Sequence, residues 1–333
     1  MTQKTNLNIS PYYDDFDKDN QFYKVLFKPG FPVQARELST LQSILQNQLE
    51  SFGTHMFKDG SMVIPGNIAY DPDYYSIKIE REFLGVPVSL YLDELKGKKL
   101  TSEATGVSVV IDDYLYPEDN SQIDTLTIFV KYINSGPDNV DATMNDGESL
   151  ITDEAFVYGN TPVSAGESVL KLIDDEACFV GSSVSLAAGV YFIRGTFVEV
   201  AADKIVLNPY DNDPSYRVCL NINEQLLTAK QDESLYDNAR GFSNFAAPGA
   251  DRLKIETTLA KKELSDVNDT NFLELIRIDD GEIRFTADKS QYNLIRDYFA
   301  KRTYEESGNY SLEDFEIDVL NSLNDGITGE GVY

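Results

Sequence analysis

Residues 273–285 read LELIRIDDGEIRF. Apolar and polar side chains alternate on both sides of a short turn, residues 279–282, and this pattern predicts a β-hairpin. Strand-like runs recur along the chain at residues 76–80, 107–109, 125–132, 189–200, 216–222 and 315–319. Because these runs do not alternate regularly with helices, a doubly wound fold is excluded. The sequence predicts a mainly β fold with two notable helices (α+β).

The first of these helices is predicted at residues 33–52. Pro32 precedes it and Gly53 follows it, as is typical of helix ends. Its apolar residues are spaced three and four apart, as in a coiled-coil seam of about two heptads. The seam consists of Leu38, Leu41, Leu45, Gln48 and Phe52, and Ile44 and Leu49 widen it. Two interpretations stay open: the seam packs on its own domain, or it meets like helices of other chains.

The polar face of this helix favours the second interpretation. It carries four glutamines: Gln34, Gln42, Gln46 and Gln48. Its two acids, Glu37 and Glu50, lie off the seam, and a face with little charge suits an interface. Two heptads alone are too short for a stable coiled coil, so the β domains would have to add contact area. We therefore expect a homotrimer in which the five seam residues self-associate.

The first 32 residues are predicted to form an extended arm. Lys28-Pro29-Gly30-Phe31-Pro32 favours an extended or turning backbone. The arm is rich in aromatic side chains, namely Tyr12, Tyr13, Phe16, Phe22, Tyr23 and Phe27. Burying a large apolar side chain contributes about 1.5–3 kcal/mol, which can offset the cost of ordering the chain. We expect these residues to dock on the protein's own body or on a neighbour.

The predicted domain organisation has four parts. The arm spans residues 1–32 and the amphipathic helix residues 33–56. A first β-rich domain follows at residues 57–165, and a second at residues 166–333. The second domain contains the other notable helix, near residues 289–306, with Leu294, Ile295, Tyr298 and Phe299 on one stripe.

Charge and rare residues exclude several function classes. The 333 residues include 28 Lys or Arg against 56 Asp or Glu, a net charge of −28. Such a surface repels phosphate backbones and anionic lipid, so we expect no nucleic-acid or membrane partner. No run of 18 apolar residues predicts a transmembrane helix, and residues 1–6 lack the apolar core of a signal peptide. Cys178, Cys219 and His55 are too few for a Cys/His zinc site. His55 has apolar neighbours, which is typical of a structural histidine.

No motif points to catalysis. The sequence has no phosphate-binding GxxxxGK, no dinucleotide-binding GxGxxG after a strand and no GxSxG nucleophile elbow. Residues 15–19 space three aspartates as a calcium loop does, but Asn20 and Leu26 stand where that loop needs glycine and an acid. A carboxylate pair cannot be selected from 56 acids. We expect no enzyme activity, no catalytic, cofactor-binding or metal-binding residues, and no cofactor.

Several segments resemble a family of virion structural proteins from contractile-tailed phages, particularly cyanophages, known mostly as a domain of unknown function. The similar blocks are ISPYYDDF (9–16), FYKVLFKPGFPVQAREL (22–38), GVYFIRG (189–195), LYDNARG (235–241) and NFAAPGADRLKI (244–255). The similarity spans essentially the whole chain. It implies a non-enzymatic component of the tail or baseplate, such as a baseplate wedge or fibre-adaptor protein, that is present in many copies and binds other tail or baseplate proteins.

The same resemblance implies a location in the virion after synthesis in the host cytoplasm. Family members are often longer, so either this gene product is short or the sequence is a fragment. Two rival functions stay open. One is a receptor- or glycan-binding adhesin at a fibre tip, with tyrosines lining a shallow site. The other is a polysaccharide-cleaving tail enzyme. Both would sit at a fibre tip, whereas a scaffold would be contacted on several sides.

Overall fold

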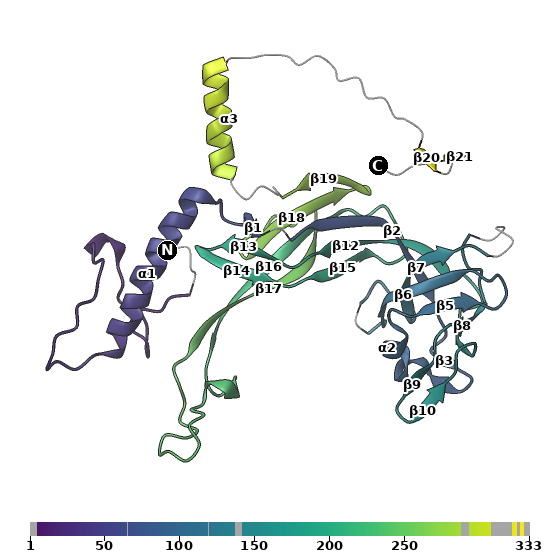
Figure 1. Cartoon of the computed structure of the whole chain (residues 1–333), viewed down its shortest axis with the longest axis horizontal. Coiled ribbons are helices and arrows are strands. Elements are labelled where there is room, and N and C mark those ends of the chain that lie inside the picture. The colour runs from purple at the N-terminus through teal and green to yellow at the C-terminus, as the bar shows by residue number, and fades with distance from the viewer. Residues whose placement is uncertain are drawn as a thin grey trace. The chain divides into compact units, whose positions relative to one another are not determined.

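The computed structural model describes residues 5–64, 66–118, 120–136, 142–287 and 293–307, together with residues 322–324 and 327–329. In this described part the protein is mainly β with three α-helices, so the predicted fold class is confirmed (Figure 1). The chain divides into two compact units, Met1–Gln291 and Tyr292–Tyr333.

The second unit contains α3 (Asn293–Ser307) and a short antiparallel pair, β20 (Ser322–Asn324) and β21 (Ile327–Gly329). Helix α3 is the helix predicted near residues 289–306. Tyr298 and Phe299 of its predicted stripe are exposed. The side chains of Leu294 and Ile295, and the strand predicted at residues 315–319, lie outside the described part.

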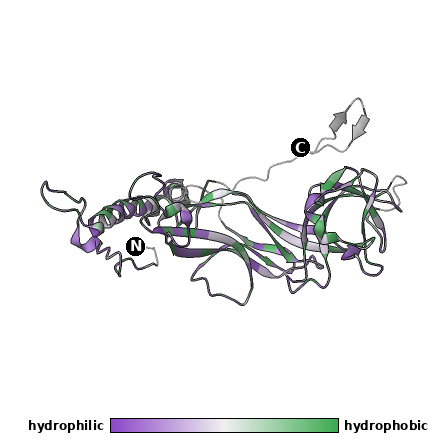
Figure 2. Ribbon diagram, turned by 90° about the horizontal axis from the view of Figure 1, so that it is seen from below, coloured by the Kyte–Doolittle hydropathy of each residue, from purple (hydrophilic) through white to green (hydrophobic). Residues whose placement is uncertain are grey.

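The largest sheet of the first unit has eight antiparallel strands in the order β11-β8-β5-β6-β7-β2-β12-β15. Their bounds are β2 (Ile68–Lys78), β5 (Lys99–Ser102), β6 (Ser108–Leu115), β7 (Thr127–Asn134), β8 (Ser149–Thr152), β11 (Ser168–Lys171), β12 (Cys178–Leu186) and β15 (Asp203–Asn208). Ile79, just after β2, pairs with Leu172, just after β11. The strands from β2 through β11 therefore close into a barrel, which Figure 2 shows as a ring.

The barrel, residues 75–178, has an apolar core. Its fully buried side chains include Ile77, Leu100, Ile111, Ile128 and Leu150. The shorter elements of this segment are β3 (Glu82–Phe83), β4 (Val86–Pro87), the 3-10 helix η2 (Val88–Leu90), α2 (Leu92–Leu95), β9 (Phe156–Tyr158) and β10 (Thr161–Val163). Leu92 and Leu95 bury both ends of α2 in the barrel core, and the Tyr91 hydroxyl donates a hydrogen bond to the Val169 carbonyl at 2.7 Å.

A second core lies in the body, which we define as residues 57–74 and 179–287. Its sheets are β17-β16-β18-β19 and β1-β13-β14. The bounds are β1 (Met62–Ile64), β13 (Gly189–Ile193), β14 (Thr196–Val200), β16 (Tyr216–Leu227), β17 (Arg252–Glu263), β18 (Phe272–Asp279) and β19 (Glu282–Thr286). Strands β18 and β19 form the hairpin predicted at residues 273–285. Asp280 and Gly281 in its turn both have positive φ, as the tight hairpin turn requires.

The pair β2/β12 joins the two cores. Ile68 and Leu186 pair at one end of it and lie in the body core, whereas Ile77 and Cys178 pair at the other end, at the barrel core. The barrel is therefore inserted between β2 and β12. This arrangement corrects the predicted division at residues 165 and 166, because strands from both sides of that division share one sheet. Alternation locates a strand, but it does not identify a partner about 100 residues away.

Helix α1 (Ala35–Met56) corresponds to the predicted helix, with a different end. Gln34 and Glu37 form a reciprocal capping box at its start. The helix continues through Gly53, which was predicted to stop it, because Gly53 packs against the body. The remaining 3-10 helices are η1 (Lys18–Asn20) and η3 (Glu233–Leu235). None of the described helices is long and apolar enough to cross a membrane.

Candidate functional site

One face of α1 holds the helix on the body. Ile44 is buried, and the Gln46 side-chain amide donates hydrogen bonds to the Gly195 carbonyl at 3.0 Å and to the Thr196 hydroxyl at 3.1 Å. Gly195 lies in the turn between β13 and β14, and Thr196 is the first residue of β14. Gly53 lies against the Phe192 ring so closely that a Cβ at this position would be 2.4 Å from a ring carbon. A residue without a side chain is therefore needed at this contact.

The opposite face of α1 is exposed. Leu38 is 51% exposed, Leu45 is 61% exposed and Phe52 is 63% exposed. Leu41 is half-buried and Gln48 is exposed, so four of the five predicted seam residues are open to solvent in the single chain. Ile44, which was predicted to widen the seam, is buried instead. We call Leu38, Leu41, Leu45, Gln48, Leu49 and Phe52 the α1 stripe.

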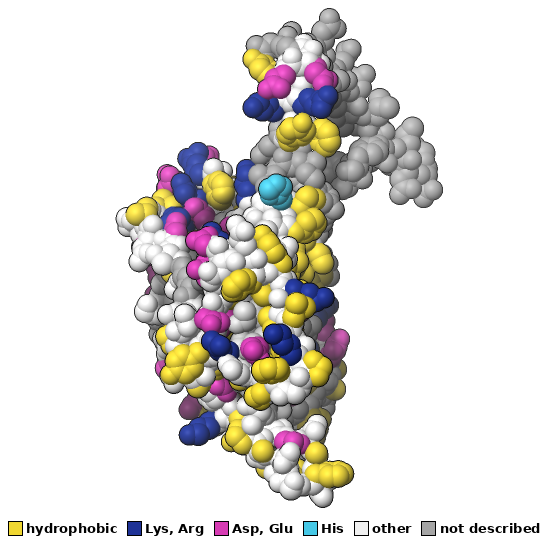
Figure 3. Space-filling model, turned by 90° about the vertical axis from the view of Figure 1, so that its left-hand side faces the viewer, with side chains coloured by type: hydrophobic (Ala, Val, Ile, Leu, Met, Phe, Trp, Pro, Cys, Tyr) yellow, Lys and Arg dark blue, Asp and Glu magenta, His cyan; other side chains and the backbone are white. Residues whose placement is uncertain are grey.

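Apolar side chains lie in several groups, among polar and charged ones, on the face of the molecule that carries α1 (Figure 3). The structure does not use all four glutamines in the same way. Gln34 caps the helix and Gln46 binds the body, whereas Gln42 and Gln48 are exposed. His55, predicted to be a structural histidine, is exposed on the last turn of α1. That prediction is wrong: of its apolar neighbours, Phe57 is buried just after the helix, whereas Phe52, one turn before His55, is exposed as well.

The first half of the arm is attached to the body and to α1. The Thr5 backbone and hydroxyl donate to the Glu224 carboxylate, at 3.1 and 2.9 Å. The Tyr12 hydroxyl donates to Asp251 at 2.7 Å, and this bond raises the pKa of Tyr12. Asp14 is buried and accepts a hydrogen bond from the Ser43 hydroxyl of α1. Residues 5–16 are thus positioned by polar contacts.

The carboxylate that Thr5 binds belongs to a buried ion pair. Arg194 and Glu224 are paired, with only 7% and 4% of their side chains exposed. Burial alone would raise the pKa of Glu224, but hydrogen bonds from Arg194 and Thr5 outweigh it and lower that pKa. The arm therefore completes the hydrogen bonding of a charge that lies inside the body.

The second half of the arm is not covered by the chain. Phe22, Tyr23 and Phe27 of the predicted docking arm are exposed, and so is Tyr13, whereas Tyr12 and Phe16 are half-buried. The arm also exposes Leu26 and Phe31, at 73% and 70%. No backbone hydrogen bond joins residues 22–27 to any residue that the structure describes. A monomeric protein rarely leaves so many large apolar side chains open together.

A groove of about 760 Å³ lies between the arm, α1 and the start of β17. Pro11 and Tyr12 form one wall, Leu38 and Gln42 another, and Leu253 contributes from β17. The groove is continuous with the α1 stripe through Leu38. The stripe, the groove and the arm together form one surface that a macromolecular partner could cover.

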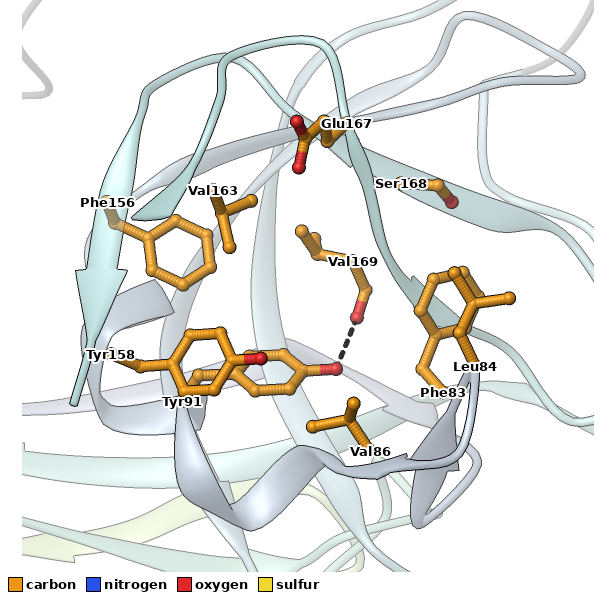
Figure 4. A pocket seen from close by; sticks show the side chains of 10 residues that line it. All are labelled: Phe83, Leu84, Val86, Tyr91, Phe156, Tyr158, Val163, Glu167, Ser168 and Val169. Carbon is orange, nitrogen blue, oxygen red and sulfur yellow. Dashed lines mark hydrogen bonds between the residues drawn. The ribbon is translucent and has the colours of Figure 1, made fainter. Parts of the chain in front are cut away.

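A separate, smaller pocket of about 110 Å³ lies at the barrel (Figure 4). Its walls come from the β3/β4 turn, from Tyr91 and from the β9/β10 hairpin. No sequence motif marks this pocket, since its lining residues are spread from Phe83 to Val169. The one local signal is Leu84-Gly85, a large apolar residue in a tight turn.

The reactive side chains offer little chemistry. Burial raises the pKa of both thiols, Cys178 and Cys219, to about 11, so both are protonated at neutral pH and are poor nucleophiles. Among the residues that the structure describes, no three His, Cys, Asp or Glu side chains come together as possible ligands of a metal ion. The features that stand out are surfaces for binding.

Comparison with known proteins gives one family. A family model described as Domain of unknown function (DUF4815) matches residues 10–149 and residues 131–328. No curated protein and no solved structure matches the chain. The matched segments include α1, the barrel and the body.

Proposed function

The chain belongs to the family described as Domain of unknown function (DUF4815), and we propose that it is a non-enzymatic structural component of a phage virion. The observation that carries this proposal is the α1 stripe, an apolar helix face that the chain itself leaves exposed. An exposed apolar face of this kind is typical of a protein that functions by assembly.

The partner of the stripe is proposed to be the same helix of other copies, most simply in a homotrimer. A specific interface buries about 800 Å² on each partner, which is more than one face of a 22-residue helix supplies. The adjoining groove, with Pro11 and Tyr12 from the first half of the arm, would supply the rest. The interpretation that the seam packs on its own domain is disfavoured, because Leu45 and Phe52 point away from that domain.

The proposed location is the tail or baseplate, as a baseplate wedge or fibre-adaptor protein that binds other proteins of the same assembly. Support for this part comes from the resemblance of residues 9–16, 22–38, 189–195, 235–241 and 244–255 to phage tail proteins. The same segments build the arm, the β13 strand under α1 and the wall of the groove. Some of the similar blocks thus contribute residues to the proposed assembly surface.

The adhesin alternative requires tyrosines in a shallow binding site. The barrel pocket contains Tyr91 and Tyr158, but the Tyr91 hydroxyl is already bonded to Val169. At about 110 Å³ the pocket suits one side chain better than a sugar chain. A glycan array probed with the full chain distinguishes the two functions, and specific glycan retention would favour the adhesin.

Particle assembly tests the proposal directly. Leu45→Asp with Phe52→Asp should leave a folded, soluble chain that is absent from purified particles, as measured by mass spectrometry of the particles. The matched control is Val267→Asp, an exposed apolar residue of the body away from α1. Incorporation of the stripe variant at the level of the control would contradict the proposal. So would release of reducing ends from host polysaccharide by the purified protein.

A further inference from the structure

The barrel pocket is apolar inside and acidic at its mouth. Figure 4 shows Val163, Val169 and Val86 around the cavity, with the Glu167 carboxylate above it. Glu167 is exposed and has no ion-pair partner in the part of the chain that is described. The hydroxyl of Ser168 beside it is buried without a hydrogen-bond partner.

Leu84 forms an unusual wall of this pocket. Its side chain is 86% exposed, and its backbone has φ of +51°, a conformation that costs energy for a residue other than glycine. Gly85 follows at φ +78° and completes the turn. A large apolar side chain held open to solvent in a strained turn is the kind of feature that a binding partner would cover.

The barrel also carries an excess of negative charge. Residues 75–178 contain 20 Asp or Glu and 7 Lys or Arg, a net charge of −13, nearly half of the total for the chain. Each of these seven basic side chains is already paired with an acid of the same segment. A partner for this surface must therefore bring apolar and positively charged groups of its own.

The exposed part of the arm has this composition. Residues 20–33 contain Lys24 and Lys28 and no acid, in a chain of net charge −28. In an extended backbone, side chains two residues apart lie on the same side, about 6.8 Å from each other. Leu26 is then flanked on its own side by the two lysines. Neither lysine forms an ion pair with a described residue.

We infer that residues 22–28 of one copy dock on the barrel pocket of a second copy. Leu26 enters the pocket between Leu84 and Val163, and Lys24 or Lys28 pairs with Glu167. The size is suitable, because a cavity of about 150 Å³ holds a benzene ring and this pocket of about 110 Å³ is open to the surface. The arm and the pocket are different patches, so the contact is heterologous and can join successive copies into a ring or a row.

This inference identifies the barrel of a second copy as the partner of the arm, and it rests on the proposed assembly function. It adds a second contact between copies to the one through the α1 stripe. Binding of a labelled peptide tests it. The probe is a fluorescein-labelled peptide of residues 18–34, and the receptor is the full chain carrying Leu26→Asp, whose own arm cannot compete.

Fluorescence anisotropy should report saturable binding that weakens as salt is added, because lysines and Glu167 contribute. Leu84→Asp in the receptor should weaken binding by about tenfold or more, which corresponds to loss of one apolar contact. Glu167→Lys should also weaken binding of the natural peptide. It should restore binding of a peptide that carries Lys24→Glu and Lys28→Glu. The control Glu103→Lys reverses an exposed acid of the barrel outside the pocket and should change nothing.

Two outcomes would overturn the inference: no binding at millimolar peptide, or binding that Leu84→Asp and Glu167→Lys leave unchanged. The second outcome would place the arm on another site, such as the groove beside α1. Light scattering of the Leu45→Asp, Phe52→Asp variant separates the two proposals. If that variant is monomeric and the parent is not, the proposed function survives a failure of the peptide to bind.

Discussion

The barrel and the body are both built from antiparallel strands, but they use the chain differently. The barrel is one continuous stretch, residues 75–178, whereas the body combines residues 57–74 with residues 179–287. The barrel core is apolar. The body contains buried ion pairs, including Arg217 with Glu274, that join strands distant in sequence.

This difference predicts how the stability of each region responds to substitutions. A buried charge is costly once its partner is removed, so the body depends on several separate segments being in place together. The arm is one of those segments, since its Thr5 binds Glu224. The barrel also contains buried charges, Lys78 and Glu148, but their partners Asp124, Thr105 and Asn145 all belong to the same continuous segment. We therefore expect destabilising substitutions in the barrel to affect the barrel alone. Destabilising substitutions in the body should also affect the arm and α1.

The largest effect is expected at Arg217 in the body. Its side chain is 4% exposed and bonds Glu274 at 2.9 Å and Asp269 at 2.6 Å. Burial alone would raise the pKa of Glu274, but its bonds with Arg217 and Arg277 lower it to about 2. Arg217→Ala leaves these acids without their partner and should lower the free energy of unfolding by about 3–5 kcal/mol. Urea denaturation measures the loss.

Arg277 provides a matched control for that prediction. It bonds the same Glu274 at 2.8 Å but is 44% exposed. Arg277→Ala should cost about 0–1 kcal/mol, because exposed pairs are screened by water. Equal losses for the two variants would mean that burial of the charge does not determine the stability of the body.

The next effect is expected in the barrel. Leu100 is fully buried, and Leu100→Ala should cost about 2–4 kcal/mol through the lost contacts and the cavity that remains. Hydrogen exchange followed by mass spectrometry should show faster exchange in residues 75–178 and unchanged exchange in α1. Leu90→Ala, at an exposed leucine of the same segment, should have little effect. Faster exchange throughout the body would refute the independence of the barrel.

A smaller effect is expected where α1 meets the body. Gly53→Ala places a methyl group against Phe192, and such overpacking costs about 1–3 kcal/mol. The higher helix propensity of alanine returns about 1 kcal/mol, so the net loss should be about 1 kcal/mol. Exchange should increase in α1 and leave the barrel unchanged. Ser51→Ala, on an exposed position of the same turn, is the control. A stabilised Gly53→Ala protein would mean that the contact is not tight.

The smallest effect concerns pH. Lys261 donates hydrogen bonds to the Val206 carbonyl at 3.1 Å and to the Leu207 carbonyl, and burial lowers its pKa to about 8. Its pKa in the unfolded chain is about 10.4. Between these values the unfolded state binds more protons, so the stability contribution of Lys261 rises as the pH increases from about 8. Partial exposure reduces the gain to about 1 kcal/mol.

Comparing the parent with Lys261→Met tests this sign. Thermal unfolding at pH 7 and at pH 9.5 should show that the parent gains stability relative to the variant at the higher pH. The tyrosines and cysteines, whose pKa values in the unfolded chain are about 10 and about 8.5, are the same in both proteins, so their ionisation cancels in the comparison. An unchanged difference between the two proteins would indicate that Lys261 keeps its ordinary pKa in the fold.

The sequence predicted those features that depend on neighbouring residues. The hairpin at residues 273–285 and the presence and start of helix α1 follow from local periodicity and turn residues. Gly53 misled the prediction of the helix end, because its role is set by Phe192, about 140 residues away. The insertion of the barrel between β2 and β12 depends on pairing at the same kind of distance.

The candidate site was predictable in part. Spacing identified the apolar residues of α1, but only the packing of Ile44 against the body reveals which face stays exposed. Composition identified the aromatic arm, although its attachment through Thr5 and Asp14 depends on partners in other elements. The barrel pocket has no sequence motif, since its walls meet only after the barrel closes.

The central claim is that the α1 stripe joins copies of this chain. The most direct measurement is the mass of the parent protein in solution by light scattering at micromolar concentration. A trimer of the 37.3 kDa chain gives about 112 kDa, and Leu45→Asp with Phe52→Asp should reduce this to a folded monomer. A parent protein that stays at 37.3 kDa, or a stripe variant that keeps the mass of the parent, would contradict the claim.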